Sequence, residues 1–91
     1  MDEFRILLTD HAIGDLGKLP GEIRNQIHSV IHSLTSSPFS SGKRIKRLKG
    51  FKPPLFRFRS GDYRVIFQIE EKTIIVFRVI DRKLLIRIVK T

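Results

Sequence analysis

Four arginines in the second half of the chain have the type and spacing to hold a phosphate. Arg57 and Arg59 lie two residues apart in a segment where apolar and basic residues alternate, so they share one face of a strand. Arg64 begins the next extended segment and is expected across from them, and Arg82 follows the last long apolar run. Guanidinium groups that converge on an open sheet face bind phosphate bidentately and stabilise the extra charge of a phosphorane-like transition state. The alternative is four independent surface arginines.

Other chemistries have little support. His28 and His32 have the i, i+4 spacing of two metal ligands on a helix, but they lie off its apolar stripe, and the chain has no cysteine. His11 is expected at a helix start, and Glu70 and Glu71 are expected on a turn where their carboxylates diverge. No serine elbow or phosphate-binding glycine loop is present. We therefore expect these residues to be solvated, and we expect neither a bound metal nor a cofactor.

The charge of the chain is concentrated in its second half. The 91 residues contain 18 Lys and Arg against 9 Asp and Glu, which gives a net charge of +9. Residues 1–42 carry 3 basic and 5 acidic side chains, whereas residues 43–91 carry 15 basic and 4 acidic ones. The segment from Lys43 to Arg59 holds eight basic residues and no acidic one. Such an asymmetry predicts binding to a polyanion.

Length and hydropathy predict a single domain over residues 1–91. The N-terminus begins acidic and has no signal-peptide pattern, and no apolar run approaches the roughly 18 residues of a membrane span. We therefore expect a cytoplasmic protein with no membrane partner.

The periodicity of apolar residues predicts an α+β fold. A strand over 4–8 is expected to lead into a helix over 12–19 with Thr9 or Asp10 as its N-cap, and a second helix over 23–34 follows after a short turn. The segment 45–48 is a short strand or an irregular arm, and 84–89 is a last short strand or a tail. Strands are expected over 55–59, 63–69 and 73–80. The predicted order is β-α-α-β-β-β, with the N-terminal strand and a two-helix hairpin packed on one face of a small antiparallel sheet.

Several short motifs, in the same order along the chain, resemble those of toxins of the RelE/ParE superfamily. The opening TDHA at 9–12, followed by DL at 15–16 and KLP at 18–20, is similar to the start of these toxins, and Leu34 with Ser37-Pro38 is similar to their "L…NP" helix end. KRLKG at 46–50 resembles their "KKLKG", and RFRSGDYRVIF at 57–67 resembles "YRLRVGDYRVIY". DRK at 81–83 falls on the region written "HRKxxY". The resemblance covers residues 4–87.

The resemblance implies a RelE-like toxin of a type II toxin–antitoxin pair that cuts mRNA in the ribosome without a metal. In these enzymes the ribose 2′-hydroxyl attacks the neighbouring phosphate. Arg57, Arg64 and Arg82 fall on the family's catalytic basic residue, its phosphate-binding arginine and its leaving-group arginine. The partners implied are a small acidic antitoxin, in a hetero-oligomer, and the ribosome with mRNA. The side chains expected to bind RNA are Lys43, Arg44, Lys46, Arg47, Lys49, Arg59 and Lys83.

The chain departs from the family at its proton-transfer residues. Leu55 replaces the first lysine of the "KxK" pattern, Asp81 stands where the nucleases often have His, and Ile86 stands where they have Tyr. Asp81 would accept a proton only with a raised pKa, which Arg82 and Lys83 oppose. Tyr63 is expected to face the core. Two further functions therefore stay open: a ParE-like inhibitor of DNA gyrase, and a catalytically weakened member that mainly binds its antitoxin.

Overall fold

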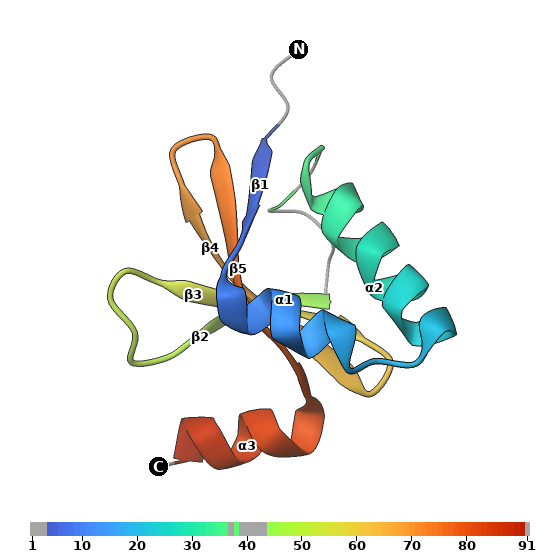
Figure 1. The fold of residues 1–91 in the computed structure, drawn as a ribbon. Helices are drawn as coiled ribbons and strands as arrows, with labels where there is room; N and C mark the ends of the chain where they lie inside the picture. The colour runs from blue at the N-terminus through green and yellow to red at the C-terminus, as the bar shows by residue number, and fades with distance from the viewer. Residues whose placement is uncertain (1–3, 37, 39–43, 91) are drawn as a thin grey trace.

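The computed structural model describes residues 4–36, 38 and 44–90, and for residues 86 and 88–90 it describes the backbone alone. Figure 1 shows a sheet with two helices against one side and a third helix at the end of the last strand. The elements are β1 (Arg5–Leu8), α1 (Asp10–Gly17), α2 (Gly21–Leu34), β2 (Ile45–Leu48), β3 (Leu55–Ser60), β4 (Tyr63–Glu70), β5 (Thr73–Asp81) and α3 (Arg82–Lys90).

The five strands form one mixed sheet in the order β1-β5-β4-β3-β2. Neighbours from β2 to β5 are antiparallel, as predicted, and the segment 45–48 is an edge strand rather than an irregular arm. β1 differs from the prediction because it pairs in parallel with β5, with Arg5 opposite Thr73 and Leu8 opposite Val76. The sheet is therefore antiparallel in all but this one pair, and the predicted α+β class is confirmed.

One apolar core joins α1 and α2 to the sheet. The apolar stripe of the second predicted helix supplies Ile27, Ile31 and Leu34, which are all buried. The alternation in β3 and β4 sends Phe58 and Val65 to the same side. The half-buried Tyr63 also packs against this core, as predicted. The core cluster consists of Ala12, Leu16, Leu19, Ile27, Ile31, Leu34, Phe58, Val65, Phe67, Ile74, Val76 and Val79.

The two N-terminal helices form the predicted hairpin, which Figure 1 shows opened into a V. Arg24, in the first turn of α2, holds the corner. Its Nε donates to the carbonyl oxygen of Leu16 at 3.1 Å, and its Nη2 donates to that of Leu19 at 3.0 Å. These carbonyls lie at and just beyond the C-terminal end of α1, where helical partners run out and a cation is favourable. One side chain thus satisfies the end of α1 and orients α2.

Thr9 connects the end of β1, the start of α1 and the exposed edge of β5. β5 is longer than β1, so on the edge away from β4 its C-terminal half has no strand beside it among the described residues. The Thr9 N–H donates to the Val76 carbonyl at 3.1 Å, and the Thr9 hydroxyl donates to the Phe77 carbonyl at 2.8 Å. The same hydroxyl accepts from the Ala12 N–H at 3.1 Å, so Thr9 is the N-cap of α1. Of the two predicted caps, the structure uses Thr9.

Asp15 occupies the next part of this edge in place of a strand. Its Oδ2 accepts from the Val79 N–H at 2.9 Å, and its two oxygens accept from Nε and Nη2 of Arg78 at 2.8 and 3.2 Å. We refer to these three hydrogen bonds as the Asp15 clamp. The clamp lies beside a bulge, because the register between β4 and β5 shifts between Ile66 and Phe67. It thereby fixes β5 where the strand changes register.

The clamp also sets the charge state of Asp15. Burial opposes ionisation and would raise the pKa of this carboxyl. Hydrogen bonds from Arg78 and Val79, with the positive charges of Arg78 and Lys18, outweigh burial and place the pKa below its ordinary value. Asp15 is therefore ionised wherever the protein is folded near neutral pH.

The segment expected as a last strand or a tail is instead the helix α3. Asp81 ends β5 and its Oδ1 accepts from the Lys83 N–H at 2.7 Å, as an N-cap does. The helix contacts β4 and β5. Ile66 and Ile80 lie in register with Arg57 and Arg64, on the sheet face opposite α1 and α2, yet are only 6% and 4% exposed. This face is thus open over β2 and β3 but shielded over β4 and β5.

Replacing Asp15 by Asn is expected to lower the free energy of unfolding by about 2 kcal/mol at pH 7, because it breaks a charge-assisted pair in a half-buried site. The folded pKa of Asp15 lies below its unfolded value of about 3.9, so the stabilisation is complete well above that value and is lost as the pH falls through the folded pKa. Chemical denaturation of parent and Asp15→Asn from pH 7 to pH 3 measures this. The difference in the free energy of unfolding between the two proteins should narrow below about pH 4. The exposed Glu70→Gln serves as control and should shift stability by less than about 0.5 kcal/mol. An Asp15→Asn protein as stable as the parent at pH 7 would contradict the role of the clamp.

Candidate functional site

Three of the four predicted arginines meet in one hollow. Arg57 of β3, Arg64 of β4, and Arg82, Lys83 and Leu85 of α3 line a space of about 470 Å³, which we call the arginine hollow. It lies on the sheet face opposite α1 and α2, where the start of α3 approaches β4. The neighbouring strands β3 and β4 and the N-terminus of α3 thus contribute one guanidinium group each to the hollow. A hollow lined by four cations and one leucine suits an anion such as a phosphodiester.

The turn between β3 and β4 orients two of these arginines. Gly61 adopts a left-handed φ of +59°, which allows a two-residue hairpin turn. Nη1 of Arg64 donates to the carbonyl oxygens of Gly61 and Tyr63, both at 2.9 Å. The Arg82 N–H donates to the Asp62 carbonyl at 2.9 Å, and Nε of Arg82 lies 3.8 Å from Oδ1 of Asp62. The predicted hairpin turn therefore also positions the cations beside it.

The arginines repel one another in this arrangement. Partial burial lowers the pKa of Arg57, and the charge of Arg59 lowers it further. Partial burial also lowers the pKa of Arg64, as do the charges of Arg57, Arg59 and Arg82, with only Asp62 acting in the opposite direction. All these groups remain cationic near pH 7. Because the folded chain holds these cations together, an anion in the hollow would relieve their mutual repulsion.

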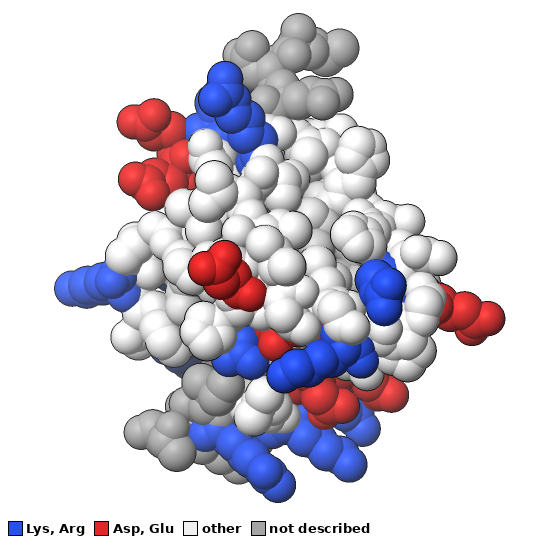
Figure 2. All heavy atoms as spheres, in the orientation of Figure 1, with Lys and Arg blue, Asp and Glu red and all other residues white. Residues whose placement is uncertain are grey.

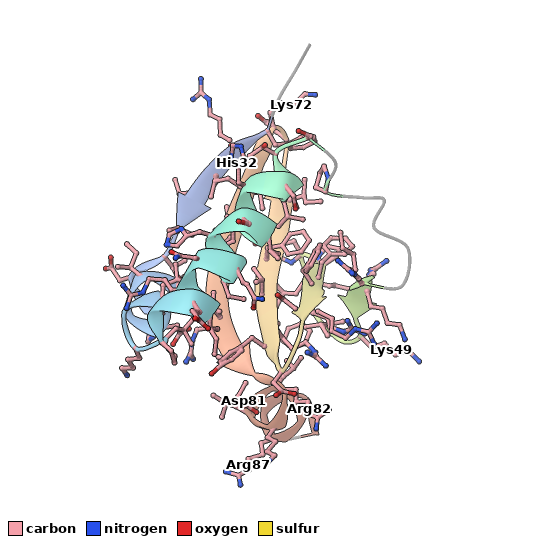
Figure 3. The ribbon with its side chains drawn as sticks, turned by 90° about the vertical axis from the view of Figure 1, so that its right-hand side faces the viewer. His32, Lys49, Lys72, Asp81, Arg82 and Arg87 are labelled. Atoms are coloured by element: carbon pink, nitrogen blue, oxygen red, sulfur yellow. The ribbon has the colours of Figure 1, made fainter. Side chains whose placement is uncertain are left out.

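Asp81 has a structural role beside the hollow. Its carboxylate caps α3 through the Lys83 N–H and does not line the hollow. Figure 3 shows Asp81 and Arg82 at the end of the sheet where α3 begins, with Arg87 further along the helix and directed away. Position 86 falls within α3. Of the described residues that line the hollow, none is a His, Tyr, Asp or Glu, so the site supplies positive charge rather than a group that titrates near neutral pH.

The remaining basic residues divide between the two faces of the sheet. Lys46 is in register with Arg57, so it shares the face of the arginine hollow. Arg47 is in register with Phe56, which packs against the main core, so it lies on the face of α1 and α2. The two side chains are adjacent on one edge strand and both are exposed.

Other residues predicted to bind RNA lie outside the arginine hollow. Arg59 is opposite Arg64 in register, but with Arg44 it lines a separate hollow of about 450 Å³ between α2 and the end of β3. Lys49 follows β2 and stands well apart from Arg82 in Figure 3. Lys43 falls outside the described residues.

Sequence reasoning did not identify two contributors to the site. Asp62 was expected only as a turn residue, although its place directly before Tyr63-Arg64 puts it beside the start of β4. Leu85 lies in an apolar run whose pattern fits a strand as well as a helix, so its position against the arginines could not be derived.

Charge is unevenly distributed on the surface. In Figure 2 the middle of the face that carries α1 is mostly uncharged, and basic side chains gather in the lower part of the view, with acidic ones among them. His11, His28 and His32 are exposed, as expected. Within the described residues, no three His, Asp or Glu side chains form a group that could hold a metal ion. The helices described are all too short or too polar to cross a membrane.

Comparison with known proteins gives consistent matches across nearly the whole chain. The family model described as the ParE toxin of the type II toxin–antitoxin system parDE matches residues 6–84. Toxin RelE3 of Methanocaldococcus jannaschii is 32% identical over 81 residues, which cover 87% of this chain and 91% of that protein.

Solved structures agree with these matches. The archaeal RelE–RelB complex from Pyrococcus horikoshii superposes with a TM-score of 0.76 at 25% identity, covering 88% of this chain and 96% of that chain. The RelB–RelE complex from Methanococcus jannaschii gives a TM-score of 0.73 at 31% identity, covering 90% and 96%.

The match to the family model and the similarity to a RelE toxin over most of both chains therefore show a toxin of a type II toxin–antitoxin system. Within that class, the chain belongs to the RelE/ParE toxin superfamily.

The repulsion at the hollow predicts that removing one charge stabilises the free protein. Arg59 is exposed and lies directly opposite Arg64, a like-charge pair that disfavours the folded state. Arg59→Gln is therefore expected to raise Tm by about 1–3 °C in low salt, and the gain should disappear near 0.5 M NaCl. Thermal unfolding at both salt concentrations measures this. Arg47→Gln, on the other face, is the control and should change Tm by less than half as much. A fall in Tm for Arg59→Gln in low salt would refute the repulsion argument.

Proposed function

We propose that this toxin is a cytoplasmic, metal-independent endoribonuclease that cuts mRNA in the ribosome. The observation that carries the proposal is the arrangement of Arg57, Arg64 and Arg82, which come from three elements and face one hollow of about 470 Å³. Resemblance to RelE enzymes assigns these same three positions to catalysis, and membership of the superfamily supports that assignment.

In the proposed reaction, the RNA supplies its own nucleophile. The ribose 2′-oxygen attacks the adjacent phosphorus and loses its proton, while the bond from phosphorus to the 5′-oxygen breaks and that oxygen gains a proton. The products are a 2′,3′-cyclic phosphate and a 5′-hydroxyl end. Arg57 and Arg64 neutralise the non-bridging oxygens as charge builds in the transition state, and Arg82 stabilises the departing 5′-oxygen. Fixed donors in a partly dehydrated hollow do this better than water, because they need no reorganisation.

The proposed mechanism uses charge rather than a protein base. Among the described residues that line the hollow, Arg57, Arg64, Arg82 and Lys83 carry polar side chains, and all four are cations. Asp81 is engaged with the Lys83 N–H as a helix cap. We therefore assign proton removal to solvent within the ribosomal complex, and to no side chain of this protein.

The first experiment is single-turnover cleavage on ribosomes programmed with mRNA. Arg57→Ala, Arg64→Ala and Arg82→Ala are each expected to slow cleavage by about 10²-fold, or ~2.7 kcal/mol, as the loss of a preorganised donor does. Arg87→Ala is the matched control, because Arg87 is on the same helix as Arg82 but points away from the hollow. If the parent cuts and the three hollow variants cut as fast, the assigned mechanism is wrong.

A second candidate function is inhibition of DNA gyrase, as in ParE-like toxins. The match of residues 6–84 to the ParE toxin family model favours it, as does the use of Asp81 as a helix cap at the position of the nuclease histidine. Brief induction in bacteria separates the two functions. New mRNA 5′ ends in reading frame support the nuclease, whereas DNA breaks with intact mRNA support the gyrase inhibitor.

We also propose that a small acidic antitoxin binds this chain and covers the arginine hollow. Two of the similar structures are complexes of RelE with RelB, and a cationic hollow attracts an acidic segment that orders on binding. In a purified complex, Arg57, Arg64 and Arg82 should resist phenylglyoxal at least about 10-fold better than in the free toxin, since the reagent needs an accessible guanidinium. Arg47, on the opposite face, gives the reference rate by mass spectrometry. Equal modification in the free and bound states would exclude inhibition by covering the hollow.

A further inference from the structure

The basic surface continues from the arginine hollow onto the edge strand β2. Arg57 faces two ways: it lines the hollow, and its Nη1 donates to the carbonyl oxygen of Arg44, just before β2, at 3.3 Å. Its guanidinium therefore reaches over the neighbouring strand. Lys46 lies on that strand directly opposite Arg57 and on the same sheet face. Residues opposite one another in an antiparallel pair are about 5 Å apart at their Cα atoms, so the two side chains leave the sheet from neighbouring positions on the same face.

Lys46 has no structural task in the described part of the chain. Its side chain is exposed, and no hydrogen bond or ion pair to another described side chain engages its ammonium group. It lies on the outer strand of the sheet, where a lysine is not needed for the core. Arg47, the next residue, is equally exposed but faces the side of α1 and α2.

The cover provided by α3 restricts the routes by which a strand of nucleic acid can leave the hollow over the sheet. α3 contacts β4 and β5, and Ile66 and Ile80 are buried there. On the same face, Arg57 of β3 is half-buried at the border of this cover, and Lys46 of β2 is exposed. A polyanion held at Arg64 can therefore continue over Arg57 to Lys46 and remain in contact with positive charge.

We infer that Lys46 and Arg57 form a second phosphate position beside the arginine hollow, so that the site binds at least two successive phosphates of single-stranded RNA across strands β4, β3 and β2. This inference rests on the proposed nuclease function and adds the substrate's path to it. Lys46 acts by binding and positioning the RNA, because it does not line the hollow where the scissile phosphate is assigned.

The test compares Lys46→Gln with Arg47→Gln, which lose the same charge from adjacent residues on opposite faces. Binding of the free toxin to fluorescein-labelled, 2′-O-methyl RNA of two and of six nucleotides is measured by anisotropy from 25 to 200 mM salt. For the hexanucleotide, Lys46→Gln should weaken binding about 5-fold and reduce the slope of log K against log salt by about 0.7, the value for one phosphate of a single strand. For the dinucleotide, which has one internucleotide phosphate, Lys46→Gln should have less than a 2-fold effect. Arg47 is also expected from the sequence to bind RNA, but its register places it on the opposite face, outside this path, so Arg47→Gln should leave both unchanged.

Cleavage on programmed ribosomes gives a second readout. Lys46→Gln should raise KM about 5-fold and change kcat by less than 2-fold, as expected for a group that binds substrate and transition state equally. Equal effects of Lys46→Gln and Arg47→Gln on hexanucleotide binding would overturn the inference, as would a loss of antitoxin affinity in Lys46→Gln with RNA binding intact. Either result leaves the proposed function standing if Arg64→Ala still slows cleavage by about 10²-fold. Conversely, if the parent never cuts RNA, the function fails, while the salt slopes still decide whether Lys46 binds a phosphate.

Discussion

The arginine-bearing face depends on how the free edge of β5 is completed. β1 pairs with β5 only as far as Val76, and beyond it Thr9 and Asp15 supply the hydrogen bonds that another strand would make. The Asp15 clamp holds Arg78 and Val79 at the bulge, which determines that Val79 enters the main core while Ile80 turns to the opposite face. The chain then reaches Asp81 and Arg82 in a fixed direction. Arg82 thus follows a strand that β4 holds on one edge and that Thr9 and Asp15 complete on the other.

A second constraint is the repulsion that this placement creates. Partial burial lowers the pKa of Arg64, and the charges of three neighbouring arginines lower it further. The fold offsets part of this with polar groups of the β3–β4 turn, since the carbonyls of Gly61 and Tyr63 accept from Arg64 and Asp62 lies beside Arg82. These partners are backbone oxygens and one exposed carboxylate, which compensate the charge only weakly. The free protein thus retains an uncompensated positive field, the property required for binding a polyanion quickly and tightly.

Local patterns in the sequence predict the parts of this architecture that depend on neighbouring residues. The period of two in 55–59 places Arg57 and Arg59 on one face, the stripe from Ile23 to Leu34 gives α2, and Thr9 is recognisable as a cap. The parallel pairing of β1 with β5 joins segments about 68 residues apart and leaves no local signal. The helix α3 is ambiguous for a different reason, because the apolar run 84–89 suits either a strand or a helix and only the Asp81 cap decides. The division of Lys46 and Arg47 between two faces follows from a register that is known only once β2 is paired.

Asp81 has a structural role, as the N-cap of α3, at a position where the sequence resemblance implies a catalytic one. Asp81, at the junction of β5 and α3, directly precedes two residues that line the hollow, and it caps the helix that carries them. A carboxylate that accepts the Lys83 N–H at 2.7 Å is fixed in orientation, which suits a cap. Its negative charge at the first turn also favours the helix dipole. The junction therefore fixes two cations of the hollow, at the position where the sequence resemblance implies a histidine in nucleases of the superfamily.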